Sequence, residues 1–266
     1  MRASSAVFNS NELIKIKDQE WLNRQRIAGK IAALTLTLLE KQVREKTTHS
    51  LIELNKIAED FIHAAGGIPT FKGYRGFPAG CCISVNRQLV HGIPTDYKLF
   101  DGDLISFDLG VTIDGAIADT AITCIYGDPK SPQHLKLVRA TEESLMKGIA
   151  TIKVGERLGV IGNAISRCAK GYGFSVVSSY GGHGLDYDTP HASPFVSNKA
   201  NPDEGVRIRA GMTLAIEPLF VLGPSNRTRV MDDGWTVVCD DLCSHFEHTV
   251  FVHEDRIEVI TDRSVL

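Results

Sequence analysis

Hydrophobic side chains recur at helical spacing over the first quarter of the chain. From about Asn11 to Val43, apolar residues return every three or four positions with charged residues between them, which predicts an amphipathic helix. A second helix is predicted from Ser50, because Ser50 and Glu53 have the spacing of a capping box. The Gly66–Gly67 pair is expected to end it, since glycine readily adopts the backbone conformation that closes a helix.

The pattern then changes to the period of two that is typical of strands. Segments rich in β-branched residues alternate apolar and polar positions and are separated by glycine and proline. Between two groups of such segments, Ser131 and Pro132 predict a helix start, with helical sequence to about Ile149 and again from about Leu158 to Lys170. The predicted strands are CCISV, DLISFDLGVTI, AIADTAITCIY, FSVVSSY, MTLAIEPLFVL, WTVV, FEHTVFV and RIEVI.

The order of elements is therefore helices, strands, helices, strands, which predicts an α+β fold. Each half combines a helix-rich segment with strands of antiparallel character. The sequence has no low-complexity linker, so we expect a tail at 1–10 and a single domain over 11–266. The stretch 188–205 contains three prolines and few apolar pairs, and it is predicted to be the longest loop.

Composition narrows the class of protein. The chain has 266 residues, 43% of them hydrophobic, and a net charge of −3, which excludes collagen-like and disordered sequences. This charge gives no general attraction for nucleic acid or anionic membranes, and no nucleic-acid motif is present. There is no apolar run of the roughly 20 residues that cross a bilayer. The N-terminal segment lacks the pattern of a secretory signal, which predicts a cytoplasmic protein.

The cysteines leave two interpretations open. Six cysteines are too few for a disulfide scaffold in a chain of this length. Cys239 and Cys243, followed by His245 and His248, could be taken as a zinc site, although structural zinc sites usually have closely paired cysteines. Unpaired thiols in a reducing cytoplasm are the favoured interpretation.

Two aspartates lie in strand-like surroundings on either side of a predicted turn. Asp108 and Asp119 are eleven residues apart, with Asp114 and Gly115 between them. A hairpin with its turn at these two residues would bring the two carboxylates together on neighbouring strands. A carboxylate in an apolar strand needs a partner, a hydrogen bond or a cation. Taken singly, each aspartate is more often a surface or turn residue.

Two glutamates and a histidine complete the set. Glu217 and Glu247 are also flanked by hydrophobic residues, and His183 lies in the glycine-rich segment YGGHG. Four carboxylates that share apolar surroundings require a common counter-charge, which a pair of metal ions provides. Together with one imidazole, they could hold two divalent cations roughly 3 to 4 Å apart, as in hydrolytic two-metal sites.

At this point the sequence resembles the methionine aminopeptidases, which are pita-bread peptidases of family M24. The similarity runs in order from about Asn11 to the C-terminus. Between His183 and Glu217 there are 33 residues, and 29 more precede Glu247, which leaves no room for the helical insertion of type II enzymes. The resemblance is therefore to the short bacterial type I form, without a zinc-finger extension. The motifs that carry it are HGIP at 91–94, DLG with Asp119 eleven residues on, GGHG at 181–184, MTLAIEP at 212–218, DGWTV at 233–237 and FEHT at 246–249.

The resemblance implies roles for the five residues of the acidic set. Asp119 and Glu247 would bridge two divalent metal ions, of cobalt, manganese, iron, zinc or nickel. Asp108 would bind one metal, and His183 with Glu217 the other. A hydroxide activated by both metals would attack the scissile carbonyl, and Glu217 would carry a proton to the leaving amine.

The implied activity is removal of the initiator methionine from nascent proteins when the second residue is small. The substrate's free α-amine would bind a metal. The enzyme would be a monomer with transient proximity to the ribosome. His91 would hydrogen bond the substrate, and the side chains implied for the methionine pocket are Tyr74, Phe77, Cys82 and Trp235.

Three features depart from the family pattern. Phe71 stands where bacterial relatives often have cysteine, which predicts a narrower or more apolar pocket entrance. The second active-site histidine usually follows the GGHG histidine by seven residues, but that position here is Pro190 and the next is His191. A one-residue bulge would bring His191 into place as the second catalytic and substrate-binding histidine. The loop DYDTPHASP also differs, so the rim of the substrate site is expected to differ.

Two other functions remain alternatives. A prolidase or proline-specific aminopeptidase would have a similar metal site, but such enzymes usually have a further N-terminal domain, and only 107 residues precede Asp108. A non-enzymatic binding protein of the same fold would have lost its metal ligands, whereas this chain retains all five.

Overall fold

The computed structural model describes residues 14–264. Its helices are α1 (Gln19–Arg44), α2 (Leu51–Ala64), η1 (Tyr74–Gly76, a 3-10 turn), α3 (Pro132–Ile149) and α4 (Gly159–Tyr172). Its strands are β1 (Ile68–Pro69), β2 (Cys82–Val85), β3 (Gln88–Val90), β4 (Leu104–Ile113), β5 (Ala116–Ile125), β6 (Ser175–Val176), β7 (Gly181–Asp186), β8 (Thr189–Ser197), β9 (Thr213–Ile216), β10 (Leu219–Val221), β11 (Thr228–Val230), β12 (Val237–Cys239), β13 (Cys243–His245), β14 (Glu247–Val252) and β15 (Ile257–Val259).

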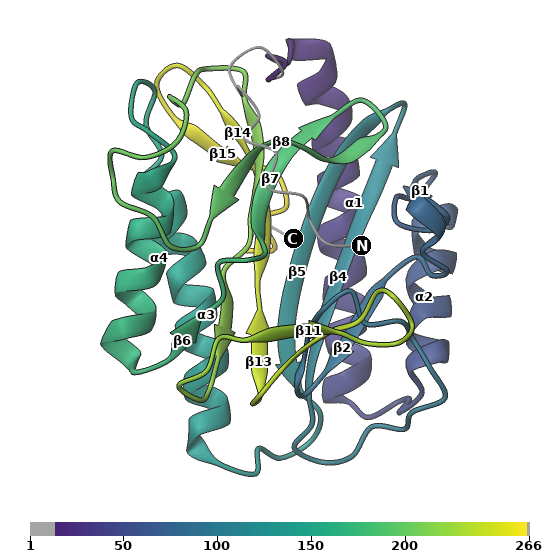
Figure 1. Ribbon diagram of the computed structural model, residues 1–266. Helices are drawn as coiled ribbons and strands as arrows, with labels where there is room; N and C mark the ends of the chain where they lie inside the picture. Colours follow the sequence, from purple (N-terminus) through teal and green to yellow (C-terminus); the bar gives the residue numbers. More distant parts are fainter. Residues whose placement is uncertain (1–13, 265–266) are drawn as a thin grey trace.

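One antiparallel sheet dominates the fold. Within residues 14–264 it has nine strands, in the order β1-β4-β5-β14-β9-β7-β8, with β2 also paired to β4 and β15 to β14. Helices α1 and α2 pack on the half that contains β4 and β5, and α3 and α4 on the half that contains β9, β7 and β8 (Figure 1). The helices thus lie on one side of the curved sheet and leave its other face for the site. None of the helices in the described part of the chain is long and apolar enough to cross a membrane.

The predicted helices are confirmed, with one correction at the N-terminus. Helix α1 begins at Gln19 and not near Asn11, which itself lies outside the described residues. Asp18 caps the helix by accepting a backbone N–H of its first turn at 2.8 Å. The residues just before Asp18 do not continue the helix. Instead, the Lys17 N–H donates to the Gly211 carbonyl at 2.8 Å.

The other helix starts agree with the sequence. Ser50 caps α2 by accepting the Glu53 N–H at 3.4 Å, and Ser131 caps α3. The Glu53 carboxylate does not complete a capping box, because it accepts the Thr48 hydroxyl instead, at 2.5 Å. Helix α2 is followed by Gly66 in the left-handed region, as expected.

The predicted hairpin is formed by β4 and β5. Asp114 and Gly115 form its turn with φ angles of 44° and 78°, a conformation in which glycine is favoured. The register places Asp108 opposite Ala121 and Gly110 opposite Asp119. Since residues two apart share a face, the two aspartates lie on the same face of adjacent strands.

Strand β14 joins the two halves of the sheet. It lies between β5 and β9 and pairs with both. Glu247 is opposite Ala121 of β5, while the next residue, His248, is opposite Ile216 of β9. The main hydrophobic core takes side chains from helices and strands of both halves. The division into a tail at 1–10 and a domain at 11–266 stays a prediction.

The expected loop over 188–205 is wrong for its first half. Strand β8 covers most of that half and pairs with β7. Prolines are compatible with it because β8 is the last strand of the sheet, where a missing N–H breaks no ladder. The predicted strand MTLAIEPLFVL is interrupted at Glu217 and Pro218, which separate β9 from β10.

Candidate active site

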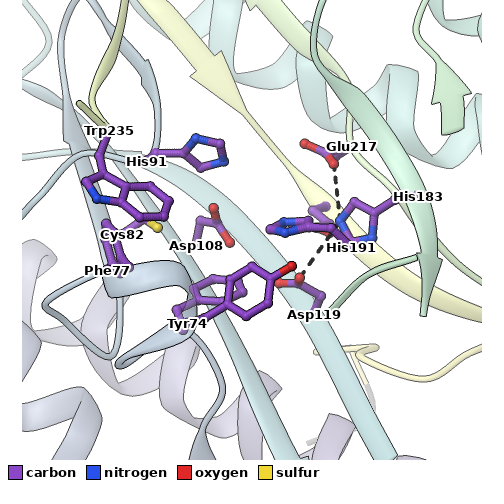
Figure 2. Close-up of a pocket in the computed structure, with 12 residues that line it drawn as sticks. Tyr74, Phe77, Cys82, His91, Asp108, Asp119, His183, His191, Glu217 and Trp235 are labelled. Carbon is purple, nitrogen blue, oxygen red and sulfur yellow. Dashed lines mark ion pairs between the residues drawn. The ribbon is translucent and has the colours of Figure 1, made fainter. Parts of the chain in front are cut away.

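The twelve residues predicted for the site line a single cavity (Figure 2). Acidic side chains and His183 occupy one end of it, and aromatic side chains with Cys82 occupy the other. The lining residues are Phe71, Tyr74, Phe77, Cys82, His91, Asp108, Asp119, His183, His191, Glu217, Trp235 and Glu247. The structure therefore brings together side chains from segments that are far apart in the sequence.

The β4–β5 hairpin and β14 supply three of the carboxylates. Asp108, Asp119 and Glu247 are buried, and each offers an oxygen atom within 4.8 Å of the others. Two hydroxyl groups fix the strands that carry them. Thr249 Oγ1 donates to the Asp119 carbonyl at 2.7 Å and accepts its N–H at 2.8 Å, while Thr120 Oγ1 donates to the Glu247 carbonyl at 2.8 Å.

His183 on β7 faces these carboxylates from the other half of the sheet. Its Nε2 lies 3.5 Å from Glu217 Oε1, 3.9 Å from Glu247 Oε1 and 4.0 Å from Asp119 Oδ2. His183, Glu217 and Glu247 form a second group that could hold a cation. All five predicted metal ligands are thus gathered at one end of the cavity.

Glycines beside His183 allow β7 to approach its neighbours closely. A Cβ atom at Gly182 would lie 2.2 Å from the carbonyl oxygen of Ala215, and one at Gly184 would lie 2.1 Å from that of Ser193. Larger residues at either position would push the adjacent strands away. The glycines of the GGHG motif therefore let β7 lie close to its neighbouring strands, and this also sets the place of the His183 imidazole.

Burial changes the pKa of all five predicted metal ligands. Loss of hydration raises the pKa of Asp119 to about 7 and, with repulsion from Asp119, that of Glu217 to about 8. Burial and then repulsion between the carboxylates raise the pKa values of Asp108 and Glu247 well above their usual range. Burial lowers the pKa of His183 to about 4, so its ring is neutral at pH 7.

The donor set fits divalent cations. Asp119 Oδ1 and Glu247 Oε1 are buried without a hydrogen-bond partner in the part of the chain that the structure describes. Over the same residues, no lysine or arginine forms an ion pair with any of the four carboxylates, and those of Asp119, Glu217 and Glu247 pair with histidine. Orphaned carboxylate oxygens with a neutral imidazole are the ligands expected for divalent metals.

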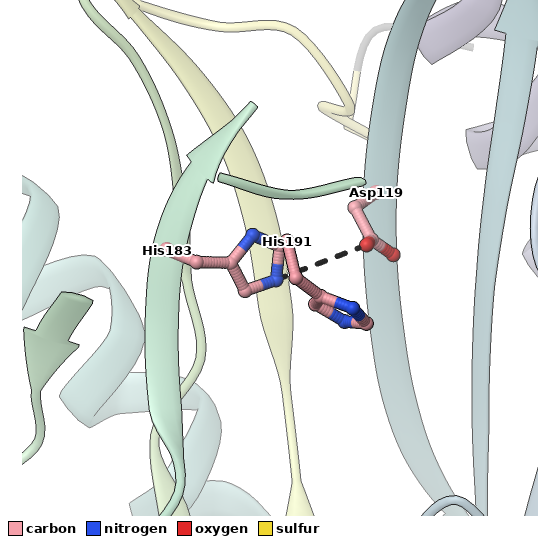
Figure 3. A group of neighbouring side chains, drawn as sticks. All are labelled: Asp119, His183 and His191. Carbon is pink, nitrogen blue, oxygen red and sulfur yellow. Dashed lines mark ion pairs between the residues drawn. The ribbon is translucent and has the colours of Figure 1, made fainter. Parts of the chain in front are cut away.

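The expected bulge is present and brings His191 into the cavity. The register of β7 and β8 shifts on either side of Gly184. The His191 ring lies 4.7 Å from that of His183, between centroids, and both belong to a third candidate ligand group with Asp119 (Figure 3). Phe71 stacks on the His191 ring, with 6.4 Å between the ring centroids. The two residues that depart from the family pattern at positions 71 and 191 are therefore neighbours in the structure.

His91 lines the cavity between its acidic and apolar ends (Figure 2). Its φ of 58° is in the left-handed region, which is uncommon for a histidine and is often associated with functional sites. Its ring centroid is 6.4 Å from those of both His191 and Trp235. Burial lowers the pKa of His91 to about 4 and that of His191 well below its usual value.

The apolar end of the cavity is built around Phe77. Its ring meets Trp235 edge to face at 5.2 Å, and Cys82 belongs to the same hydrophobic cluster. Burial and the nearby carboxylates raise the pKa of the Cys82 thiol well above its usual range. The thiol is therefore protonated and acts as a small apolar surface.

The zinc interpretation of the later cysteines is not supported, and a histidine was missed. All six cysteines are free thiols, as favoured above. Cys239, Cys243 and His248 belong to no candidate ligand group of the described residues. His245, however, lies with Nε2 3.6 Å from Glu217 Oε2. Its position two residues before Glu247 was the signal available in the sequence.

Comparison with known proteins identifies the family. The profile of metallopeptidase family M24 matches residues 23–254. The methionine aminopeptidase of Clostridium perfringens is 44% identical over 94% of this chain and 99% of its own length. The crystal structure of methionine aminopeptidase from Thermotoga maritima superposes with a TM-score of 0.89 at 35% identity, over 94% of this chain and 100% of that one.

A more distant structural likeness concerns the fold alone. The prolidase from Pyrococcus furiosus gives a TM-score of 0.74 at 20% identity, over 93% of this chain and 65% of that one. The sheet and its helices are thus those of the pita-bread fold, as the resemblance implied. The identity over nearly the whole length is with the first group, and the chain belongs to metallopeptidase family M24 as a member of the methionine aminopeptidases.

Proposed function

We propose that this protein is a metal-dependent aminopeptidase that removes an N-terminal methionine when the second residue is small. The observation that supports this most directly is the cavity itself. Its acidic end has the donor set of a hydrolytic metal centre, and its other end is an apolar pocket lined by aromatic side chains and Cys82. A hydrolytic centre beside a side-chain pocket selects the residue next to the cleaved bond.

The acidic end would hold two divalent cations. Asp119 and Glu247 would be shared by both, because each belongs to the group that contains Asp108 and also to a group that contains His183. Asp108 would complete one position, and His183 with Glu217 the other. When bound, such cations lower the pKa of a water molecule and polarise the scissile carbonyl.

Glu217 is the residue best placed to move a proton. Its carboxylate lies at the cavity wall, with Oε1 3.5 Å from His183 Nε2. Asn198 holds the Glu217 backbone through a hydrogen bond from Nδ2 to its carbonyl, at 2.9 Å. Glu217 accepts the proton that the attacking water loses and delivers it to the nitrogen of the leaving peptide.

His91 and His191 orient the substrate. Each ring is neutral at pH 7, because burial lowers its pKa, so each carries one N–H donor. Both line the cavity between its acidic and apolar ends, where the carbonyl groups of a bound peptide would lie. The methionine thioether is flexible and polarisable, and it suits contact with Phe77, Trp235 and the Cys82 sulfur.

The cellular setting is part of the same proposal. The substrates are the N-termini of nascent proteins, met by a monomeric cytoplasmic enzyme close to the ribosome. Carboxylates with an imidazole accept cobalt, manganese, iron, zinc or nickel, and the supply in the cell decides between them.

Peptide hydrolysis tests the proposal. The protein should cleave methionine from Met-Ala-Ser and leave Xaa-Pro peptides intact, and a chelator should abolish the reaction. Glu217→Ala should abolish it too, whereas the exposed Glu254→Ala serves as a control with unchanged rate. Preference for Xaa-Pro peptides would establish a prolidase, and activity that survives both the chelator and Glu217→Ala would reject the catalytic assignment.

A further inference from the structure

His245 is a buried imidazole behind the acidic end of the cavity. It does not line the cavity, its side chain is 2% exposed, and neither ring nitrogen has a hydrogen-bond partner among residues 14–264. A buried N–H without an acceptor is costly, so such a group in a folded protein needs an explanation.

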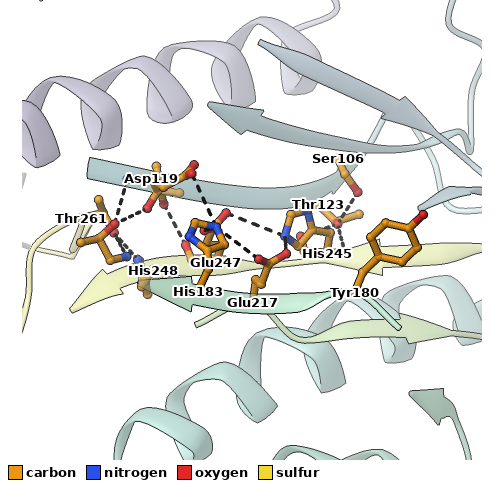
Figure 4. Close-up of polar contacts among 12 residues, drawn as sticks. Ser106, Asp119, Thr123, Tyr180, His183, Glu217, His245, Glu247, His248 and Thr261 are labelled. Atoms are coloured by element: carbon orange, nitrogen blue, oxygen red, sulfur yellow. Dashed lines mark hydrogen bonds and ion pairs between the residues drawn. The ribbon is translucent and has the colours of Figure 1, made fainter. Parts of the chain in front are cut away.

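The backbone of His245 is held firmly by hydroxyl groups of the neighbouring strands (Figure 4). Thr123 Oγ1 donates to the His245 carbonyl at 2.8 Å and accepts the His245 N–H at 2.8 Å. Since the Thr123 proton is used in this way, the Ser106 hydroxyl, 2.8 Å from Thr123 Oγ1, is the donor of that pair. Two residues on β4 and β5 therefore fix the place from which the ring extends.

The ring faces the carboxylates from the side opposite His183. His245 Nε2 lies 3.6 Å from Glu217 Oε2 and 3.9 Å from Glu247 Oε2. His183 Nε2 lies 3.5 Å from Glu217 Oε1 and 3.9 Å from Glu247 Oε1. Each histidine thus faces a different oxygen of the same two carboxylates.

Two observations distinguish His245 from a metal ligand. None of the three candidate ligand groups in the described part of the chain includes it, although His183 belongs to two of them. The carboxylate oxygens it faces are also not the ones nearest to His183. A ring in this place is suited to hydrogen bond a metal ligand and fix its orientation, and not to bind the metal itself. Residues behind metal ligands commonly have this role.

We infer that His245 is a positioning residue, which donates its Nε2–H to Glu217 Oε2 and so keeps Oε1 directed toward His183 and the cavity. Glu217 is the nearer acceptor, and an approach of a few tenths of an ångström makes a hydrogen bond of ordinary length. This inference rests on the proposed function, in which Glu217 moves a proton. It adds that Oε1, and not Oε2, is the oxygen that exchanges this proton.

Three variants test the inference kinetically. His245→Phe fills the space and removes the donor, and His245→Gln retains an N–H. His134→Phe is the matched control, because His134 is also buried with an unpartnered ring nitrogen but lies on α3. We expect His245→Phe to lower kcat roughly 10- to 100-fold with KM unchanged, and His245→Gln to recover most of it. His134→Phe should match the wild type.

The kinetic result can overturn the inference separately from the function. If the wild type cleaves methionyl peptides and His245→Phe retains its kcat, the positioning role is rejected while the function stands. Equal loss in the Phe and Gln variants would also reject it, since the donor would then not matter. A wild type without peptidase activity rejects the function itself, and the contact is then tested by the tautomer.

Nitrogen-15 NMR of the imidazole side chains in the Zn²⁺-bound protein, where the cation keeps the Glu217 carboxylate ionised, reports that tautomer directly. The signals of His245 are those absent from His245→Gln. A proton on Nε2 is expected, because both nearby acceptors face that atom. A proton on Nδ1 would overturn the inference whatever the kinetics show, and this measurement needs no substrate.

Discussion

Removing divalent cations should make the stability of this protein fall as the pH rises above about 7. The acidic end of the cavity holds four carboxylates, three of them buried and that of Glu217 12% exposed, without a lysine or arginine partner among residues 14–264. In the absence of a cation, these groups can avoid repulsion only by keeping protons. The folded state therefore holds protons that the unfolded chain has already released.

The sign of the effect follows from the direction of each pKa shift. Folding raises the pKa of Asp119 from 3.8 to about 7 and that of Glu217 from 4.5 to about 8. Stability contributed by a group of this kind decreases as the pH rises from the unfolded pKa to the folded one. The buried histidines act in the opposite direction. The pKa of such a histidine is near 6.5 in the unfolded chain and, for His183, about 4 in the folded protein, so these groups make stability rise with pH up to about 6.5. Above pH 7 they are neutral in both states and do not change the slope.

The magnitude is set by the number of retained protons. Each proton held only by the folded state changes the free energy of unfolding by about 1.4 kcal/mol per pH unit. For a domain of this size, that change corresponds to a fall in Tm of about 3 to 6 °C per pH unit. A divalent cation at a hundred times its Kd should restore about 2.7 kcal/mol, because it binds the folded state alone.

Calorimetric melting of chelator-treated protein between about pH 7 and 8.5 measures the slope. Titration of Mn²⁺ in buffers with different ionisation enthalpies should also show proton release on binding. Glu217→Gln is the matched variant, since it keeps the shape of the side chain and removes one titrating group, and its slope should be shallower. A Tm that is independent of pH over this range and unaffected by Mn²⁺ would refute the reasoning.

Three further predictions concern other parts of the chain. Phe77→Ala should lower the free energy of unfolding by about 3 to 5 kcal/mol and raise KM for methionyl peptides, measured by urea unfolding and steady-state kinetics, because it empties the apolar end. Gly182→Ala should reduce both Tm and Mn²⁺ affinity, since its Cβ would meet a carbonyl oxygen of β9 at 2.2 Å, whereas Gly171→Ala, with open space, should bind Mn²⁺ normally. Glu258→Gln should destabilise the protein by roughly 1 kcal/mol near neutral pH, a modest value because the pair with Arg26 is partly exposed. Hydrogen bonds from Arg26 hold the pKa of Glu258 at about 2, so the difference from the wild type in urea midpoint should shrink as the pH falls from 4.5 toward that value, and an unchanged difference would contradict it.

The local features of the fold could be predicted from the sequence. The turn at Asp114 and Gly115 determines the β4–β5 hairpin, and a hairpin determines which residues face each other. The proximity of Asp108 and Asp119 therefore follows from a stretch of twelve consecutive residues. The cap at Ser50 is equally local. Each depends on interactions between residues that are near in the chain.

Features that depend on distant segments could not be derived in this way. Strand β7 contains the glycines of GGHG, which have low strand propensity, and it exists because β8 and β9 supply its hydrogen bonds. The same contacts make β8 a strand despite its prolines. The prediction that His183 lies beside Glu217 and Glu247 therefore depended on the resemblance to a family. His245 was considered only as part of a possible zinc site with Cys239 and Cys243, so its place beside Glu217 was missed.

The position of β14 in the sheet has a consequence for how the enzyme is made. This strand is translated after every other strand of the sheet except β15, yet it lies in the middle and carries Glu247. While its own synthesis is under way, the two halves of this sheet have no ladder between them, and the acidic end of the cavity lacks Glu247. A newly synthesised molecule can therefore cleave other polypeptides only after β14 has left the ribosomal tunnel and paired with β5 and β9.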